Sequence, residues 1–131
     1  MKFGNKSLKA LNTCHFELQL IAHQTIKKNL LDFTIIQGYR NQKAQDEAYN
    51  NGYSKLKWPK SKHNQMPSFA FDFIPYPFID WADEDGFKAV AELLKETAIE
   101  LRNMDMISHD IKWGGDWITF IDWPHIQLEN I

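Results

Sequence analysis

The apolar segment from Phe69 to Ile74 restricts the fold of this chain more than any other feature, because it carries a carboxylate at its centre. The segment is short, rich in aromatic residues and followed by Pro75 and Pro77, so we expect a strand that ends at the first proline. Burying the carboxylate of Asp72 in such a strand costs free energy unless another group pairs with it. The fold must therefore bring a partner to Asp72.

The rest of the chain alternates helical periodicity with equally short apolar segments. Apolar residues at helical spacing predict helices over residues 7–29, 41–51 and 85–103. Further strands are predicted over Phe33–Ile36, Ile111–Trp113 and His125–Leu128, with a turn at Gly114-Gly115-Asp116 before the last one. So few strands, ending in a hairpin, favour an α+β fold with a small antiparallel sheet packed with about three helices over a doubly wound fold.

Length and composition indicate one globular domain. The 131 residues fit a single domain, 1–131, and a content of 44% hydrophobic residues supplies a core. The net charge of −2 argues against nucleic-acid binding, for which a basic excess is typical. The one basic cluster is a solvated loop or an aid in approaching an anionic polymer; it comprises Lys55, Lys57, Lys60 and Lys62.

The sequence shows neither a membrane-spanning segment nor the pattern of a signal peptide. We therefore expect a protein that is made in the cytoplasm and is not membrane-embedded. The single cysteine, Cys14, cannot form an intrachain disulfide. Because it falls within an apolar helical pattern, we expect a buried, unreactive thiol.

Two histidines are candidates for the partner of Asp72. His63 lies in the loop before that strand, and His125 opens the last strand. The pattern fits three separate, satisfied polar residues, and it also fits one cation site. Neutral imidazoles and a carboxylate are good zinc ligands, and three protein ligands plus water form a catalytic site. The spacing alone leaves both interpretations open.

Asp122 favours the metal interpretation. It precedes His125 by three residues, and Pro124 between them disfavours a helix. A second carboxylate beside a metal is the arrangement that a general base needs. The structural alternative is an aspartate that only forms a turn.

The remaining histidines are expected to lie outside this site. His15 and His23 fall on the predicted helix over residues 7–29, and His109 is expected in a solvent-exposed turn. Four tryptophans either line a substrate groove or pack in the core, and we assign none of them: Trp81, Trp113, Trp117 and Trp123.

Several short motifs, in order along the chain, resemble one family of metallopeptidases. Ser61-Lys62-His63 followed by Ala70-Phe71-Asp72 resembles the Ser-x-His and Ala-x-Asp signature of the D-alanyl-D-alanine carboxypeptidase and L-alanyl-D-glutamate endopeptidase family. The accompanying segments are also similar: Gln37-Gly38-Tyr39-Arg40 with Gln45, Gly52-Tyr53-Ser54-Lys55, and the closing stretch Trp113–Trp117 with Asp122–Leu128, which resembles phage endolysins. One departure is the gap between His63 and Asp72, which in the commonest form is shorter and contains a glycine.

The resemblance implies a fold like that of hedgehog and D-Ala-D-Ala peptidases, with one zinc ion held by His63, Asp72 and His125. It implies that Asp122 is the general base. It also implies that Arg40 contacts the substrate and stabilises the oxyanion, which suits a fixed guanidinium. Ser61 is expected to bind substrate or to orient the site.

The function that the resemblance implies is that of a zinc-dependent peptidoglycan endolysin, which hydrolyses the L-alanyl-D-glutamate bond of the peptide stem. Such an enzyme is expected to be a monomer with no separate wall-binding domain, and to reach its substrate outside the inner membrane after release by a separate holin-type protein. The alternatives are a D-alanyl-D-alanine carboxypeptidase or dipeptidase, and a non-catalytic zinc-binding module on the same fold. The presence of Asp122 and Arg40 argues against the last of these.

Overall fold

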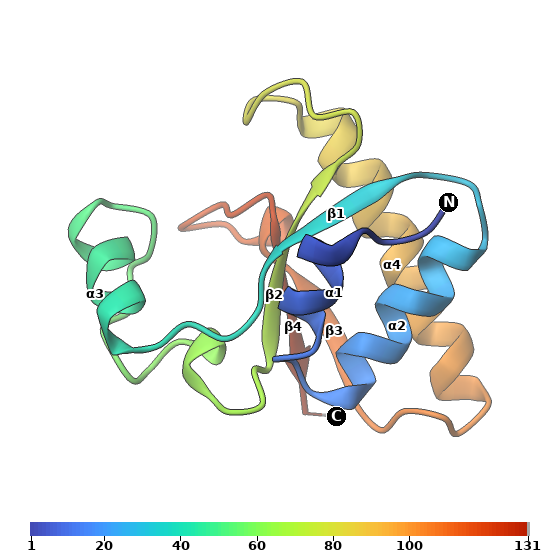
Figure 1. Ribbon diagram of the computed structural model, residues 1–131, viewed down its shortest axis with the longest axis horizontal. Coiled ribbons are helices and arrows are strands. Elements are labelled where there is room, and N and C mark those ends of the chain that lie inside the picture. Colours follow the sequence, from blue (N-terminus) through green and yellow to red (C-terminus); the bar gives the residue numbers. More distant parts are fainter. Residues whose placement is uncertain (131) are drawn as a thin grey trace.

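A four-stranded antiparallel sheet forms the centre of the computed structural model, which describes residues 1–130 (Figure 1). The strands lie in the order β1-β2-β4-β3 and comprise β1 (Phe33–Gln37), β2 (Ala70–Pro75), β3 (Asp110–Trp113) and β4 (His125–Glu129). Because β3 and β4 are paired neighbours, the expected hairpin at the end of the chain is confirmed.

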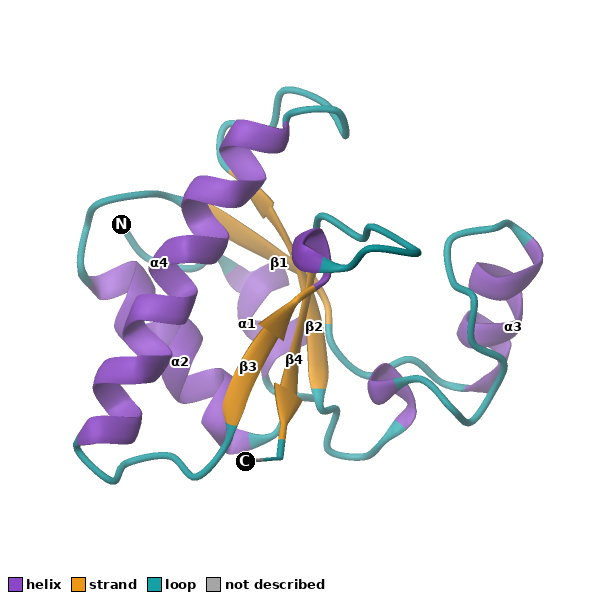
Figure 2. Cartoon of the chain, turned by 180° about the vertical axis from the view of Figure 1, so that it is seen from behind, coloured by secondary structure: helices purple, strands orange, loops and turns teal. Residues whose placement is uncertain are grey.

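Three of the four α-helices pack on one side of this sheet, and the fourth stands apart from them on the other side (Figure 2). The packed helices are α1 (Asn5–Leu11), α2 (Phe16–Lys27) and α4 (Glu84–Asn103). The separate helix is α3 (Gln42–Asn50), and two short 3-10 turns, Lys62–Asn64 and Gly114–Asp116, complete the elements. The α+β class with a small antiparallel sheet is therefore confirmed.

The two central strands show why one face of the sheet is the core and the other carries polar groups. Side chains alternate between the faces of a strand. The fully buried Phe71 and Phe73 of β2 join the core, as do Ile126 and Leu128 of β4. Asp72 alternates with the two phenylalanines and is therefore directed to the opposite face.

The predicted helix over residues 7–29 is wrong as one element, because the chain forms α1 and α2 with a break between them. At the break, the backbone of Thr13 and His15 forms hydrogen bonds with Ser68, just before β2. The imidazole of His15 then accepts the amide hydrogen of Glu17 and caps α2. The apolar periodicity continues through the break because both helices face the same core.

The other expected elements are confirmed, with ends that differ by a residue or two. Cys14 is buried, and this burial raises the pKa of its thiol to about 12, so it is unreactive as expected. Among residues 1–130, no helix combines the length and the apolar character that crossing a membrane requires.

Candidate metal centre

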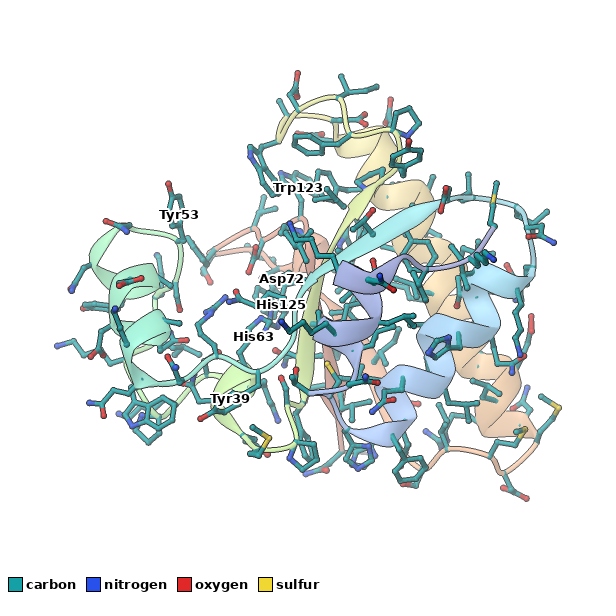
Figure 3. All side chains as sticks on the ribbon, in the orientation of Figure 1. Tyr39, Tyr53, His63, Asp72, Trp123 and His125 are labelled. Atoms are coloured by element: carbon teal, nitrogen blue, oxygen red, sulfur yellow. The ribbon has the colours of Figure 1, made fainter. Side chains whose placement is uncertain are left out.

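His63, Asp72 and His125 meet on the open face of the sheet, and we call these three residues the His63 cluster (Figure 3). The Nε2 atom of His63 lies 3.2 Å from the Oδ1 atom of Asp72 and 3.2 Å from the Nδ1 atom of His125. The same Nδ1 atom of His125 lies 3.5 Å from Asp72 Oδ1. The structure therefore brings together the three residues that the sequence predicted as ligands.

Strand pairing and a capped turn place these side chains. Asp72 of β2 and His125 of β4 are direct partners in the antiparallel register, so both project from the same face. His63 comes from the 3-10 turn Lys62–Asn64, whose first amide groups are capped by Ser61. The backbone of this turn is joined to Arg40 by a hydrogen bond of 2.8 Å from the Arg40 amide to the His63 carbonyl.

Hydrogen bonds on the far side of each ring direct a lone pair into the cluster. His63 Nδ1 lies 2.8 Å from the carbonyl oxygen of Gly38, which only accepts, so Nδ1 carries the proton and Nε2 the lone pair. His125 Nε2 lies 2.8 Å from the amide oxygen of Gln127, whose amide nitrogen donates to Glu129. His125 Nδ1 is therefore also free of a proton in the neutral ring.

The spacing of the three acceptor atoms fits a zinc ion. Two atoms bonded to one zinc ion at roughly 2.0–2.1 Å lie about 3.3 Å apart when the geometry is tetrahedral. The distances of 3.2, 3.2 and 3.5 Å in the His63 cluster are close to that value. Three lone pairs that face one another at such distances repel unless a proton or a cation lies between them. The donor set of two imidazoles and one carboxylate suits zinc and leaves a fourth position open.

The charges within the cluster reinforce one another. Burial alone would raise the pKa of Asp72, but the two neighbouring imidazoles lower it well below its usual range. Burial alone would lower the pKa of His125. A hydrogen bond to Asp72 and the negative charges of Asp72 and Asp122 raise it instead. The site is therefore built to hold positive charge next to Asp72.

Asp122 lies beside the cluster without belonging to it. Its Oδ2 atom is 3.9 Å from His125 Nδ1, and its side chain is 27% exposed. Burial, followed by repulsion from Asp72, raises the pKa of Asp122 to about 6. Its backbone packs against Gly114, where any side chain would collide with the Asp122 carbonyl, and its amide donates to the Gly114 carbonyl. Both the position and the pKa suit a general base.

Arg40 lies on the other side of Asp72, with its Nη2 atom 3.5 Å from Asp72 Oδ2. The guanidinium also donates to the side-chain oxygens of Gln37 and Gln45, at distances of 2.9–3.1 Å. Its side chain is buried to 10% exposure, so the charge is held in a fixed orientation. Arg40 is therefore an ion-pair partner of Asp72, and its guanidinium is held next to the His63 cluster.

The hydroxyl group of Ser61 has a structural role, which is to cap the turn that carries His63. The Oγ atom accepts the backbone amide hydrogen of His63 at 3.2 Å, while the Ser61 amide donates to the side-chain oxygen of Asn64. The Asn64 side chain also donates to the Arg40 carbonyl and to Gln45. Ser61 therefore orients His63, one of the two roles expected for it, and it also lines the cleft described next.

A cleft of about 930 Å³ opens over the His63 cluster, between the open face of the sheet and the segment that carries α3. Arg40, Ser61 and Asp122 line it together with the three clustered residues. Three of the four tryptophans also line it: Trp81, Trp117 and Trp123. Trp113 is instead buried in the core, where its indole donates to the Trp123 carbonyl at 2.7 Å.

The remaining histidines lie outside this cleft, as expected. The expectation that His109 is a solvent-exposed turn residue is wrong, because its side chain is 19% exposed and lies 3.1 Å from the carboxylate of Glu17. Glu17 is 92 residues away from His109 in the sequence, so no local pattern indicates the contact.

Some residues support the site although the sequence indicated no role for them. Gln127 follows His125 by two residues, the spacing that puts both on one face of β4. This two-residue spacing could have indicated from the sequence that Gln127 contacts His125. Gly38 is different, because its carbonyl reaches His63 across the fold and a side chain there would collide with Ala10, Thr13 and Cys14.

The chain is similar in sequence to known proteins. The family model of the phage L-alanyl-D-glutamate peptidase matches residues 1–128. The L-alanyl-D-glutamate peptidase of Escherichia phage T5 is 38% identical over 119 residues, which cover 88% of this chain and 81% of that protein. The peptidoglycan L-alanyl-D-glutamate endopeptidase CwlK of Bacillus subtilis is 30% identical over 116 residues, covering 75% of this chain and 61% of that protein.

A solved structure supports the fold. The crystal structure of the L-Ala D-Glu endopeptidase ChiX of Serratia marcescens superimposes with a TM-score of 0.79, covering 98% of this chain and 90% of that one. At 24% identity, this likeness concerns the fold alone. It supports the α+β arrangement of sheet and helices described above.

Proposed function

Because the chain belongs to the phage L-alanyl-D-glutamate peptidase family, we propose that it is a zinc-dependent endopeptidase that hydrolyses the L-alanyl-D-glutamate bond in the peptide stem of peptidoglycan. The observation that carries the proposal is the His63 cluster, whose three acceptor atoms stand 3.2–3.5 Å apart in a cleft wide enough for a peptide. A carboxylate and a guanidinium flank the cluster, as hydrolysis of an amide requires.

His63, Asp72 and His125 would hold one zinc ion. When bound, zinc supplies a Lewis acid that makes water a stronger nucleophile near neutral pH and polarises a carbonyl group. Gly38 and Gln127 hold the two imidazoles in the tautomers that this binding needs. Arg40 fixes the second oxygen of Asp72, so that Oδ1 faces the two rings.

Asp122 would take a proton from the attacking water and deliver it to the nitrogen of the departing D-glutamate. A carboxylate with a pKa of about 6 is mostly ionised at neutral pH, yet it is basic enough to hold that proton. Arg40 would place its positive charge near the negative charge that develops on the carbonyl oxygen. Ser61 acts through His63, whose turn it caps, and lies within reach of the bound peptide.

Digestion of purified peptidoglycan tests this function. Mass spectrometry of the products should show new L-alanine carboxyl ends and new D-glutamate amino ends. The matched control is His63→Ala, which keeps the cleft but lacks one ligand. Release of terminal D-alanine alone would replace this proposal with a D-alanyl-D-alanine carboxypeptidase. Zinc binding without any product would indicate a non-catalytic module.

The site of action follows from the substrate. Peptidoglycan lies outside the inner membrane, whereas the chain is synthesised inside the host cell. We propose that a separate holin-type protein opens the membrane and that the enzyme then acts as a monomer. Expression with and without a holin should show lysis only when both are present, and light scattering of the purified protein should give the mass of one chain.

A further inference from the structure

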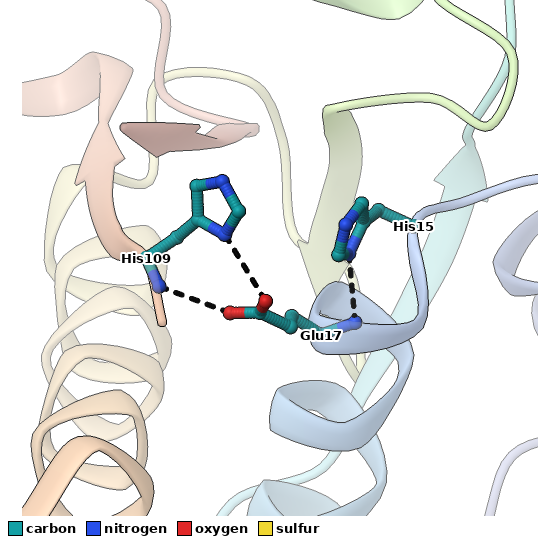
Figure 4. Close-up of side chains that lie close together, drawn as sticks. All are labelled: His15, Glu17 and His109. Atoms are coloured by element: carbon teal, nitrogen blue, oxygen red, sulfur yellow. Dashed lines mark hydrogen bonds and ion pairs between the residues drawn. The ribbon is translucent and has the colours of Figure 1, made fainter. Parts of the chain in front are cut away.

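A second group of metal-ligating side chains lies away from the cleft, and we call its residues, His15, Glu17 and His109, the His109 cluster (Figure 4). One ligand atom of each residue lies within 4.8 Å of the others. His15 and Glu17 come from the start of α2, and His109 comes from the segment just before β3. The cluster therefore joins two parts of the chain that are distant in sequence.

Glu17 is a buried carboxylate without a permanent positive partner. Its side chain is 4% exposed, and among residues 1–130 neither a lysine nor an arginine pairs with it. It accepts hydrogen bonds from the backbone amides of Ser108 and His109 and from the Ser108 hydroxyl. Its position in the first turn of α2 also places it near the positive end of the helix dipole. The one ionisable donor is His109, which is charged only when protonated. A buried charge of this kind favours a bound cation.

One distance within the cluster suits a first-row metal directly, and the ligand atom of His15 lies within 4.8 Å of the other two. His109 Nδ1 lies 3.1 Å from Glu17 Oε2, close to the separation of about 3.3 Å for two ligands of one tetrahedral zinc ion. His15 Nδ1 accepts the Glu17 amide hydrogen at 3.0 Å, so this nitrogen carries a lone pair in place of a proton. A metal would replace the proton between His109 and Glu17 and compete with the amide for His15.

Aromatic contacts hold both rings in place. The ring of Phe69 packs edge-on against both imidazoles, with its centroid 5.1 Å from that of His15 and 5.8 Å from that of His109. The centroids of the two imidazoles lie 5.4 Å apart. Phe16 stacks on the other face of His15 at 4.9 Å. Restricted rings lose little freedom when they bind, and the 19% exposure of His109 gives an ion access from solvent.

We propose that His15, Glu17 and His109 form a second site for a first-row divalent metal ion such as zinc, which fastens the start of α2 to the segment before β3. The ion binds more weakly here than in the His63 cluster. It must displace the proton between His109 and Glu17, and it must replace the hydrogen bond by which His15 caps α2. It stabilises the fold by binding the native state alone. It takes no part in hydrolysis, since the cluster does not line the cleft.

Zinc stoichiometry tests the second site. Protein stripped with a chelator is titrated with zinc by calorimetry at pH 7.5, and the bound metal is counted after dialysis. We expect two ions per chain in the wild type, one bound tightly and one more weakly. His109→Ala should bind one ion and keep its peptidase activity. One ion in the wild type, or two in His109→Ala, would overturn the proposal.

Two further variants keep the test decisive. His15→Asn retains an N-cap acceptor for α2 but removes a ligand, so it should lose the weaker ion even if His109→Ala folds poorly. His23→Ala, on the same helix but outside the cluster, should keep both ions. His63→Ala should lose the tighter ion and the activity while keeping the weaker ion. Failure of the His63 site and failure of this site are therefore distinguishable.

Discussion

The His63 and His109 clusters contain the same groups, two imidazoles and one carboxylate, but their hydrogen bonds run in opposite directions. In the His63 cluster the ring protons point outward, to Gly38 and Gln127, and lone pairs face one another. In the His109 cluster the donors point inward, to the carboxylate of Glu17. Composition alone therefore does not distinguish a cluster whose lone pairs face an open position from one whose carboxylate is already satisfied by donors.

The surroundings extend this difference to the chemistry. The His63 cluster opens into a cleft and has Asp122 and Arg40 on its two sides. The His109 cluster has aromatic rings around it, and among residues 1–130 Glu17 is its one carboxylate. An ion in the His63 cluster would have the proposed base and the substrate beside it, whereas an ion in the His109 cluster would only connect two segments of the chain. Each prediction below acts on one cluster and leaves the other unchanged.

Removing a ligand from the His63 cluster should have the largest effect. His63→Ala removes a metal ligand, and losing several kcal/mol of metal stabilisation of the transition state corresponds to roughly 1,000-fold or more in kcat/KM. The assay is release of new amino ends from peptidoglycan, with bound zinc counted in parallel. His109→Ala is the matched variant in the other cluster and should keep its activity within about twofold. Equal losses in both variants would remove the distinction between the clusters.

Neutralising Asp122 should separate chemistry from metal binding. Asp122→Asn removes the base but keeps the size of the side chain, so kcat should fall by about 100- to 10,000-fold. Bound zinc should stay at the wild-type level, because Asp122 Oδ2 lies 3.9 Å from His125 Nδ1 and outside the three-residue cluster. Loss of zinc from this variant would show that Asp122 is a ligand.

The sequence predicted the His63 cluster well because its signals are local. Asp72 stands out in an apolar strand, His125 opens the last strand, and strand pairing then makes them neighbours. His63 and Asp122 were candidates from their positions beside these strands, whereas the zinc-ligand set as a whole and the role of Arg40 came from ordered motifs that resemble a known family. Strand periodicity could also have indicated Gln127, whose side-chain oxygen accepts a hydrogen bond from His125 on the same face of β4.

The His109 cluster was missed because its contacts are not local. The sequence around Ser108 and His109 is typical of a polar turn. Its partner Glu17 lies on a helix, 91 residues before Ser108. The break at His15 was missed for a similar reason. Its cause is hydrogen bonding to Ser68, more than 50 residues along the chain, while the apolar periodicity around it continues. The packing of α2 against α4 brings Glu17 near the segment that follows α4 and carries His109.

Acid should impair the His63 cluster in two separable ways. Asp122 has a pKa raised to about 6 in the metal-free protein, and a bound cation would lower that pKa. Because a general base must be ionised, kcat/KM should fall about tenfold for each pH unit below the pKa that Asp122 has in the metal-bound enzyme. The raised pKa of His125 in the metal-free protein means that protons also compete with the metal as the pH falls. Metal content measured at each pH distinguishes the two effects. Activity that stays constant down to pH 4 would contradict both.

The smallest effect is expected on stability, from Glu17→Gln in the His109 cluster. The variant keeps the shape but loses charge-assisted hydrogen bonds to Ser108 and His109, at a cost of about 2 kcal/mol, or roughly 8 °C in Tm. Burial alone would raise the pKa of Glu17, but those hydrogen bonds lower it. A lowered carboxyl pKa stabilises the native state above the unfolded pKa, and this contribution disappears as the pH falls through the folded value. The Tm difference between wild type and Glu17→Gln, measured without metal, should therefore be constant from pH 6 to 8 and shrink below about pH 4. A difference that grows in acid would mean that Glu17 is protonated in the native state, and the carboxylate would then offer no charge to a second ion.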